Sequence, residues 1–296
     1  MNTTANNPET TIAFQGAHGA YSDMACRERF PAMTTLPCQS FEDTFEAVTS
    51  GKAGLAMIPI ENSIAGRVAD IHRLMPDSGL TIIGEHFARV NHQLLVMPGV
   101  KREDIKSVHS HVHALGQCGK VIGQLGAKAV IEADTAGSAA LLAEGKQRDR
   151  AVIASSLAAD IYGLEILQTD IEDADHNTTR FVIMSAGDAD EPKSNPSPDI
   201  TPNTVTSFVF RVRNIPAALY KAMGGFATNG INMTKLESYM LGGDFHATQF
   251  YADIEGHPWD RPVALALEEL GFFAAELKVM GVYEAHPYRY EKRNKS

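Results

Sequence analysis

Short apolar runs alternate with amphipathic stretches along the first two thirds of the chain, and this alternation predicts an α/β fold. The apolar runs predict β-strands at residues 11–14, 54–60, 80–85, 92–97, 105–109, 128–133, 150–154 and 165–168. The amphipathic stretches predict helices ending at residue 30 and spanning 41–50, 68–75, 114–125, 136–144 and 155–160. Ser40 and Asp43 have the spacing of a capping box at the start of the second helix.

Two lobes follow from the order of these elements. No helix separates the extended runs at 80–85 and 92–97, so we place a crossing between lobes near residues 85–95. The chain returns near residues 170–177 into a long apolar strand, which makes a second crossing. The predicted region of two lobes therefore spans residues 10–186.

The remaining third of the chain has a different pattern. Residues 187–203 are rich in proline, serine and charge and predict a linker. After it come a strand at 204–212, a helix at 217–227, strands at 232–239 and 245–254, a helix at 259–271 and a strand at 275–282. This βαββαβ order predicts a ferredoxin-like domain over residues 204–288, with binding or oligomerisation as its role.

A run of polar residues leads directly into the strand that closes the first region. Asp175, His176, Asn177, Thr178 and Thr179 precede Arg180 and an apolar run. Hydroxyls, an amide and a guanidinium at the mouth of a rigid strand form a preorganised set of donors for a small anion. The alternative is a turn whose Asn and Thr side chains satisfy their own backbone.

Two further loops carry candidate chemistry. Gly16 and Gly19 follow the first strand and let the backbone approach a ligand near a helix N-terminus. Glu61, Asn62 and Ser63 follow the strand at 54–60, at the edge where open α/β sheets bind ligands. The alternative is that Glu61 and Asn62 cap the helix at 68–75.

Composition excludes several classes of protein. The 296 residues are 44% hydrophobic, enough for real cores, and the formal net charge of −10 argues against nucleic acid and anionic membranes as partners. The only basic cluster lies at residues 291–295. Three cysteines without a CxxC pair argue against disulfides and zinc, and the polar N-terminus and lack of a long apolar run lead us to expect a cytoplasmic protein.

His109, His111 and His113 alternate along the chain, a spacing that puts side chains on one side of a strand. No carboxylate or cysteine stands at ligand-like spacing from them, and the helix at 114–125 interrupts any strand there. We therefore predict a polar loop facing the cleft and no metal.

Four motifs together resemble the prephenate dehydratase family with a C-terminal ACT domain, and the resemblance covers residues 12–288 in order. The motifs are Gly16-Ala17-His18-Gly19-Ala20-Tyr21-Ser22, Pro59-Ile60-Glu61-Asn62-Ser63, Ser110-His111-Val112-His113-Ala114-Leu115-Gly116-Gln117-Cys118 and Thr179-Arg180-Phe181. Val112 and His113 depart from the family's usual pattern.

The resemblance implies a catalytic region like type 2 periplasmic binding proteins, with prephenate in the cleft and no cofactor. It implies conversion of prephenate to phenylpyruvate with loss of water and carbon dioxide. The implied catalytic residues are Thr179, Glu61 and Asn62. The implied substrate-binding residues are Gly19, Tyr21, Ser22, Ser63, Ser110, Thr178, Arg180 and Phe181. Arg180 either holds a carboxylate or braces the loop through an ion pair.

The resemblance also implies feedback regulation by phenylalanine bound where two ACT domains meet, in a homodimer or homotetramer. The implied binding residues are Asn214, Pro216, Ala217, Ala218, Leu219, Asn232, Glu237 and Ser238. Ala217, Tyr239 and Met240 depart from the family's motifs. Two other functions stay open: an arogenate dehydratase, and a sensor that binds a small molecule without reaction.

Overall fold

The structure, a computed structural model, describes residues 7–187, 200–213, 215–240 and 247–291. Its contacts divide the chain into two units, one of residues up to 68 with 87–181, and one of residues 69–86 with those from 182 onward. Strands β5 (Leu80–Arg89) and β11 (Thr178–Ala186) each run from one unit into the other. Most of the predicted linker lies outside the described residues.

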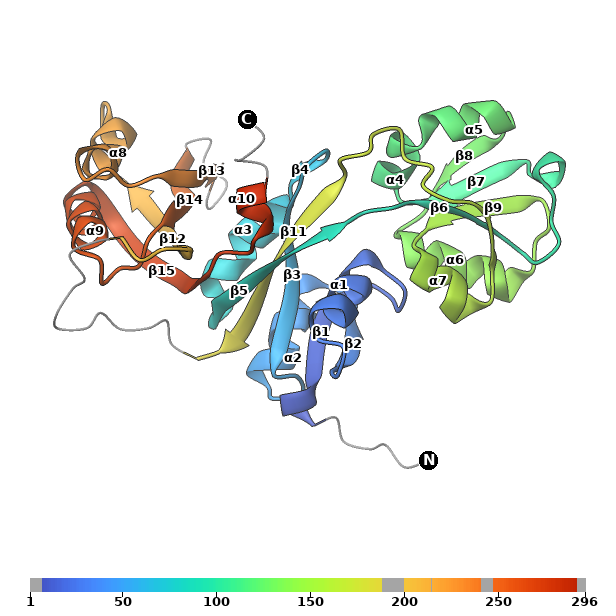
Figure 1. The fold of residues 1–296 in the computed structure, drawn as a ribbon, viewed down its shortest axis with the longest axis horizontal. Coiled ribbons are helices and arrows are strands. Elements are labelled where there is room, and N and C mark those ends of the chain that lie inside the picture. Colours follow the sequence, from blue (N-terminus) through green and yellow to red (C-terminus); the bar gives the residue numbers. More distant parts are fainter. Residues whose placement is uncertain (1–6, 188–199, 214, 241–246, 292–296) are drawn as a thin grey trace. The chain divides into compact units, whose positions relative to one another are not determined.

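The first lobe is built around a central parallel strand. β1 (Thr11–Gln15) pairs in parallel with β2 (Thr34–Cys38) and β3 (Leu55–Asn62). Helices α1 (Tyr21–Arg29) and α2 (Phe41–Thr49) connect these strands (Figure 1). The predicted capping box is confirmed, since Ser40 Oγ accepts from the Asp43 N–H at 3.0 Å and the Asp43 carboxylate accepts from the Ser40 N–H at 3.2 Å.

Strand β3 continues further than predicted. A short strand β4 (Gly66–Arg67) pairs antiparallel with its end, opposite Glu61 and Asn62. Asn62 Oδ1 accepts from the N–H groups of Ile64 at 2.9 Å and Ala65 at 2.8 Å. The side chain of Asn62 therefore closes a hairpin turn, rather than capping the following helix α3 (Ala69–Leu74).

The second lobe has its own sheet in the order β10-β6-β9-β7-β8. Its strands are β6 (Gln93–Val96), β7 (Ser107–Ser110), β8 (Lys128–Ile131), β9 (Arg150–Ala154) and β10 (Glu165–Gln168). Alternate residues of these strands pack into two cores. Leu94 packs in the core with α4 (Val112–Gln117) and α5 (Gly119–Leu125), while Leu95 packs in the core with α6 (Thr135–Gly145) and α7 (Ser156–Tyr162). Helices thus cover both faces of the sheet, and the predicted α/β class with two sheet-based lobes is confirmed.

The single helix predicted at 114–125 is wrong. The chain forms α4 (Val112–Gln117) and α5 (Gly119–Leu125), which are separated by Cys118 in a non-helical conformation. Gly116 and Gly119 flank the break and weaken helical continuity. The buried Cys118 anchors the turn, and the Asp173 carboxylate accepts from the Lys120 N–H at 3.3 Å in the first turn of α5.

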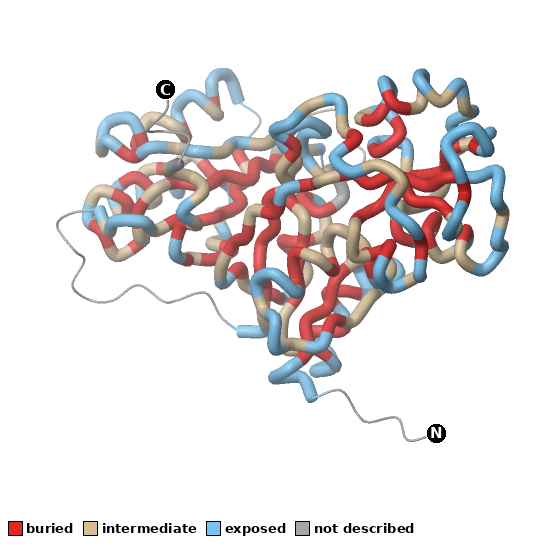
Figure 2. Tube along the Cα trace, turned by 45° about the vertical axis from the view of Figure 1, so that its right-hand side comes forward, coloured by how far each residue is buried: buried red, intermediate tan, exposed pale blue. Residues whose placement is uncertain are grey.

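The second unit contains the predicted βαββαβ order. Strands β12 (Thr204–Val212), β13 (Met233–Met240), β14 (Ala247–Glu255) and β15 (Ala274–Glu284) form an antiparallel sheet in the order β13-β14-β12-β15. Helices α8 (Ala218–Thr228) and α9 (Arg261–Phe273) pack on one face, over a core that includes Phe208, Phe226 and Leu270. Figure 2 shows the buried positions concentrated along the strands.

Several short elements had no clear sequence signal. They are strand β2, the 3₁₀ turns Pro8–Thr10, Met75–Asp77 and Arg102–Asp104, and the helix α10 (Tyr288–Glu291). Within the described ranges, no helix has the length and apolar character needed to cross a membrane.

Candidate active site

Two polar stretches that are far apart in sequence meet at the start of β11. The Ser63 N–H donates to the Thr178 carbonyl at 2.9 Å, and the Thr178 N–H donates to Ser63 Oγ at 2.9 Å. Ser63 Oγ in turn donates to the His176 carbonyl at 2.7 Å. These bonds place the end of β3 beside the first residues of β11, so Asn62 and Thr179 become neighbours.

The amide of Asn62 has a fixed orientation, because its oxygen already accepts two backbone N–H groups of the hairpin turn. Its nitrogen therefore donates, to Thr179 Oγ1 at 3.0 Å and to Asn177 Oδ1 at 2.7 Å. A hydroxyl that accepts from an amide keeps its own proton for another partner. Thr179 is thus a hydrogen-bond donor whose oxygen is held in place.

The same chain of hydrogen bonds continues to the other lobe. Asn177 Nδ2 donates to Gln117 Oε1 at 2.9 Å, and His92 Nε2 lies 2.8 Å from the same oxygen. Because an amide oxygen only accepts, His92 must carry its proton on Nε2. Its Nδ1 then accepts from the Tyr21 hydroxyl at 2.7 Å, and the same hydroxyl proton is shared with the Asn91 carbonyl at 3.0 Å.

Burial keeps the rings of His92 and Tyr21, at the end of this hydrogen-bond network, neutral. It lowers the pKa of His92, although the Gln117 hydrogen bond and the nearby Glu172 oppose this shift. Burial, together with electrostatic interactions with Cys118 and Glu172, raises the pKa of Tyr21 well above its ordinary value. Tyr21 therefore stays a donor and His92 a neutral imidazole at physiological pH.

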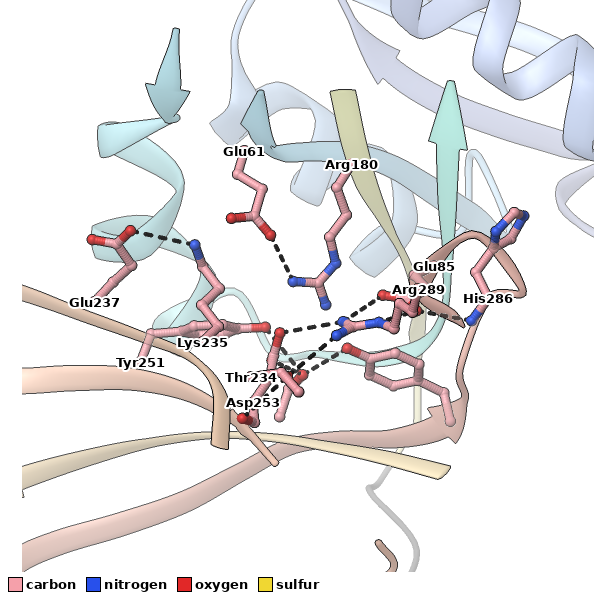
Figure 3. Close-up of polar contacts among 12 residues, drawn as sticks. Glu61, Glu85, Arg180, Thr234, Lys235, Glu237, Tyr251, Asp253, His286 and Arg289 are labelled. Atoms are coloured by element: carbon pink, nitrogen blue, oxygen red, sulfur yellow. Dashed lines mark hydrogen bonds and ion pairs between the residues drawn. The ribbon is translucent and has the colours of Figure 1, made fainter. Parts of the chain in front are cut away.

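Glu61 and Arg180 form an ion pair, with 3.0 Å between Arg180 Nη1 and Glu61 Oε1 (Figure 3). The Arg180 side chain is 3% exposed, whereas that of Glu61 is 34% exposed. A buried guanidinium requires an anionic partner, so this contact stabilises the position of Arg180, which follows Thr179 in β11.

The glycine loop brings the two lobes into contact. Gly19 has φ +87°, its N–H donates to the Asp23 carboxylate at 2.9 Å, and its carbonyl accepts from Ser155 Oγ at 2.5 Å. A Cβ on Gly19 would lie 2.8 Å from the Cα of Ala158 in α7. Burial alone would raise the pKa of Asp23, but hydrogen bonds from Arg27 and the Gly19 N–H hold it below its ordinary value.

The remaining residues implied by the resemblance differ in their surroundings. Ser22 lies half-buried in the first turn of α1, while Ser110 is fully buried and donates to the Ile153 carbonyl at 2.6 Å. Phe181 is buried in the core, next to Arg180 in β11.

The sequence predicted Asn177 only as a donor to a small anion, and it gave no role to His92 or Gln117. Gln117 and Asn177 stand inside the motifs that pointed to the site, so their polarity was a usable signal. No local pattern marks His92.

The three alternating histidines do not share a strand face. His109 lies in β7, His111 is the N-cap of α4, and His113 lies within that helix. The His111 and His113 rings are 5.1 Å apart. In the part of the chain that the structure describes, no three His, Cys, Asp or Glu side chains gather as a metal site.

The residues implied to bind phenylalanine lie in the second unit, apart from Asn214, which falls outside the described residues. Ala217 adopts φ +59° at the start of α8, a conformation that favours glycine. The Tyr239 hydroxyl accepts from Gln249, and burial raises the pKa of Tyr239 to about 12. Pro216, Ala218 and Leu219 are near or in the first turn of α8, Asn232 precedes β13, and Glu237 and Ser238 lie in β13.

Comparisons with known proteins place this arrangement among known enzymes. The model of the prephenate dehydratase family matches residues 12–189. A bifunctional N-acyl-homoserine lactone acylase/prephenate dehydratase of Komagataeibacter europaeus is 52% identical over 283 residues, covering 96% of this chain and 99% of the relative. A chloroplastic arogenate dehydratase/prephenate dehydratase of Arabidopsis thaliana is 37% identical, covering 94% and 74%. The structure of prephenate dehydratase from Arthrobacter aurescens in complex with L-phenylalanine is 30% identical, with a TM-score of 0.81 and coverage of 94% and 91%.

Proposed function

Because the chain belongs to the prephenate dehydratase family, a family of carbon–oxygen lyases, we propose that it converts prephenate to phenylpyruvate at Thr179. The observation that carries this proposal is the hydrogen bond from Asn62 to Thr179 Oγ1 at 3.0 Å. It fixes the oxygen and leaves the threonine proton available to the substrate.

The reaction depends on positioning the substrate more than on a strong acid or base. As the ring carboxylate leaves as carbon dioxide, its bonding electrons enter the ring and the hydroxyl departs from the opposite carbon, giving an aromatic product. We assign Thr179 to donate a hydrogen bond to that departing hydroxyl. A threonine is a poor acid, so the proton that completes the water molecule comes from solvent. Glu61 is paired with Arg180 and braces it, which supports the structural alternative for Arg180.

Substrate choice between prephenate and arogenate is tested by one comparison. The purified protein is incubated with each compound, and phenylpyruvate and phenylalanine are followed separately. We expect faster turnover of prephenate. A higher kcat/KM for arogenate would contradict the proposed substrate, and no turnover of either would favour a binding protein.

Regulation by phenylalanine is the second part of the proposal. The βαββαβ unit supports an ACT domain, and the Arthrobacter aurescens relative was solved with L-phenylalanine. We propose that phenylalanine binds this unit at an interface between copies of the chain and favours one quaternary state. Phenylalanine should then lower turnover and raise the melting temperature. Tyrosine serves as the control ligand, and an unchanged turnover and melting temperature at millimolar phenylalanine would contradict regulation.

A second candidate function is hydrolysis of N-acyl-homoserine lactones. The observation in its favour is the 52% identity, over nearly the full length of both chains, with a relative that is named for both activities. Release of homoserine lactone from an acylated substrate, followed by mass spectrometry, tests it. Intact substrate after incubation with dehydratase-active protein would exclude it.

A further inference from the structure

The second lobe contains another ordered row of polar side chains, away from Thr179. Ser107 and His109 alternate on β7 and therefore point to the same face of the sheet. Ser107 Oγ lies 3.0 Å from His109 Nε2, and His109 Nδ1 lies 2.8 Å from Glu132 Oε1. Glu132 follows directly after β8, the neighbouring parallel strand.

The direction of these bonds follows from their chemistry. An ionised carboxylate only accepts, so His109 carries a proton on Nδ1 and donates it to Glu132. In the neutral ring, Nε2 then has a free lone pair and accepts from the Ser107 hydroxyl. A hydroxyl, a base and a carboxylate that orients the base are the arrangement that activates a serine nucleophile.

A cavity of about 390 Å³ adjoins this row, between the sheet and α6. Leu141, Leu142 and Val152 give it an apolar part, while His109 and Glu132 lie in its wall. Its other lining residues are Ser138, Glu144, Gly145, Gln147 and Arg150. The volume falls in the range of small-molecule sites, which are about 300–1,000 Å³.

Arg150 adds a positive charge next to the serine. It is the partner of Ser107 in the parallel register of β7 and β9, so the two side chains leave the sheet on the same face. A guanidinium in that position can stabilise the oxyanion that forms when a nucleophile attacks a carbonyl.

We propose that Ser107, His109 and Glu132 form a hydrolytic site for carboxylic esters or amides with a small apolar acyl group. Ser107 Oγ forms a bond to the carbonyl carbon while its proton passes to His109 Nε2. The resulting oxyanion reforms the carbonyl and expels the alcohol or amine, which takes the proton from His109. Water then attacks the acyl-serine by the same proton transfers, which releases the acid and restores the serine.

The site deepens the second candidate function, but it stands on its own contacts. Simple esters used as probes distinguish the two proposals. If the protein does not hydrolyse N-acyl-homoserine lactones, its hydrolysis of simple esters is still measured separately. The dehydration site is also separate, since none of its hydrogen-bonded residues lines this cavity.

The cavity supplies its own matched control. Ser138 lies in the wall of the cavity, whereas Ser107 adjoins the cavity through His109, and the Ser138 hydroxyl donates to the Asp134 carbonyl at 2.6 Å at the start of α6. A serine bound to a backbone carbonyl has no base to activate it. Ser107 and Ser138 therefore lie in the same lobe, but Ser107 has a histidine as its hydrogen-bond partner and Ser138 has a backbone carbonyl.

The test uses the full chain with p-nitrophenyl acetate and p-nitrophenyl butyrate. We expect Ser107→Ala and Glu132→Gln to lower kcat/KM by at least about tenfold, and Ser50→Ala, at an exposed serine that ends α2 and does not line the cavity, to leave it unchanged. Hydrolysis by Ser107→Ala within about twofold of the parent would overturn the proposal.

A second measurement needs no variant. The parent protein is treated with a fluorophosphonate, digested and analysed by peptide mass spectrometry. Covalent label on Ser107 supports an activated serine, and label that is absent from Ser107, or equal on Ser107 and Ser138, overturns it.

Discussion

At the scale of single residues, the proposed dehydration depends on one hydroxyl whose oxygen is anchored. Thr179→Ala removes the donor but leaves Asn62 held by the hairpin turn, so the fold should persist. We expect kcat for prephenate to fall by about 10²-fold, as for the loss of one positioned donor. Steady-state kinetics checks this, with Thr179→Ser as the control that keeps a hydroxyl. A kcat for Thr179→Ala within about threefold of the parent would remove Thr179 from the mechanism.

The buried imidazole of His92 predicts a pH dependence of stability. Burial lowers its pKa from the ordinary value of 6.5, so below pH 6.5 the unfolded chain binds more protons at this position than the folded chain. The free energy of unfolding should therefore fall as the pH drops from 6.5 through the lowered pKa of His92. The Asp23 carboxyl, whose pKa is also lowered, acts in a separate and more acidic window.

Urea unfolding of the parent and of His92→Gln between pH 5 and pH 7 measures this contribution. The variant should lose less stability on acidification, although His111, whose pKa is lowered by burial and by His113, acts similarly in both proteins. Parallel pH curves for the two proteins would show that His92 does not titrate as proposed.

At the scale of elements, the close approach of the glycine loop to α7 makes a substitution of Gly19 cost more stability than its backbone conformation alone would. Gly19 and Gly51 both have positive φ, at +87° and +73°. A Cβ on Gly19 would meet the backbone of Ala158, whereas a Cβ on Gly51 would meet nothing within 4 Å. We expect Gly19→Ala to lose at least about 1 kcal/mol more of unfolding free energy than Gly51→Ala, because only the first adds overpacking to backbone strain. Chemical denaturation of both variants checks this. Equal losses of unfolding free energy would mean that the contact between Gly19 and Ala158 adds no packing cost.

The elements also differ in how well local patterns define them. The capping box at Ser40 and the strand at 204–212 depend on neighbouring residues and were predicted correctly. The helix break at Cys118 was missed because its causes include Asp173, which is distant in sequence. The extension of β3 was missed for a similar reason, since β4 supplies the pairing.

At the scale of the whole molecule, a buried charge cluster joins α10 to two strands of the second unit. Arg289 Nε lies 2.6 Å from Glu85 Oε1 and Arg289 Nη2 lies 3.5 Å from Asp253 Oδ2 (Figure 3). Both carboxylate side chains have no exposed surface. This cluster therefore joins β5, β14 and α10, which lie at three distant places in the sequence.

Arg289→Gln should lower the unfolding free energy of this unit by about 3 kcal/mol, because it removes the cation from two buried carboxylates. Arg211→Gln is the matched control, since Arg211 and its partner Glu276 are about half exposed, and it should cost less than about 1 kcal/mol. Differential scanning calorimetry of both variants measures the difference. Equal losses would mean that the C-terminal tie contributes no more than a surface ion pair.

The sequence by itself determined the order and type of most elements, the βαββαβ unit and the polar stretches that supply Asn62 and Thr179, because hydrophobic period, capping and turn chemistry act between close neighbours. Only the tertiary structure decided which polar groups meet. Asn62 and Asn177 are 115 residues apart, and His92 reaches Gln117 across 25 residues. Strand order and register create these contacts, and each hydrogen bond then fixes the direction of the next, so the neutral imidazole of His92 and the donor role of Thr179 follow from packing rather than from any local motif.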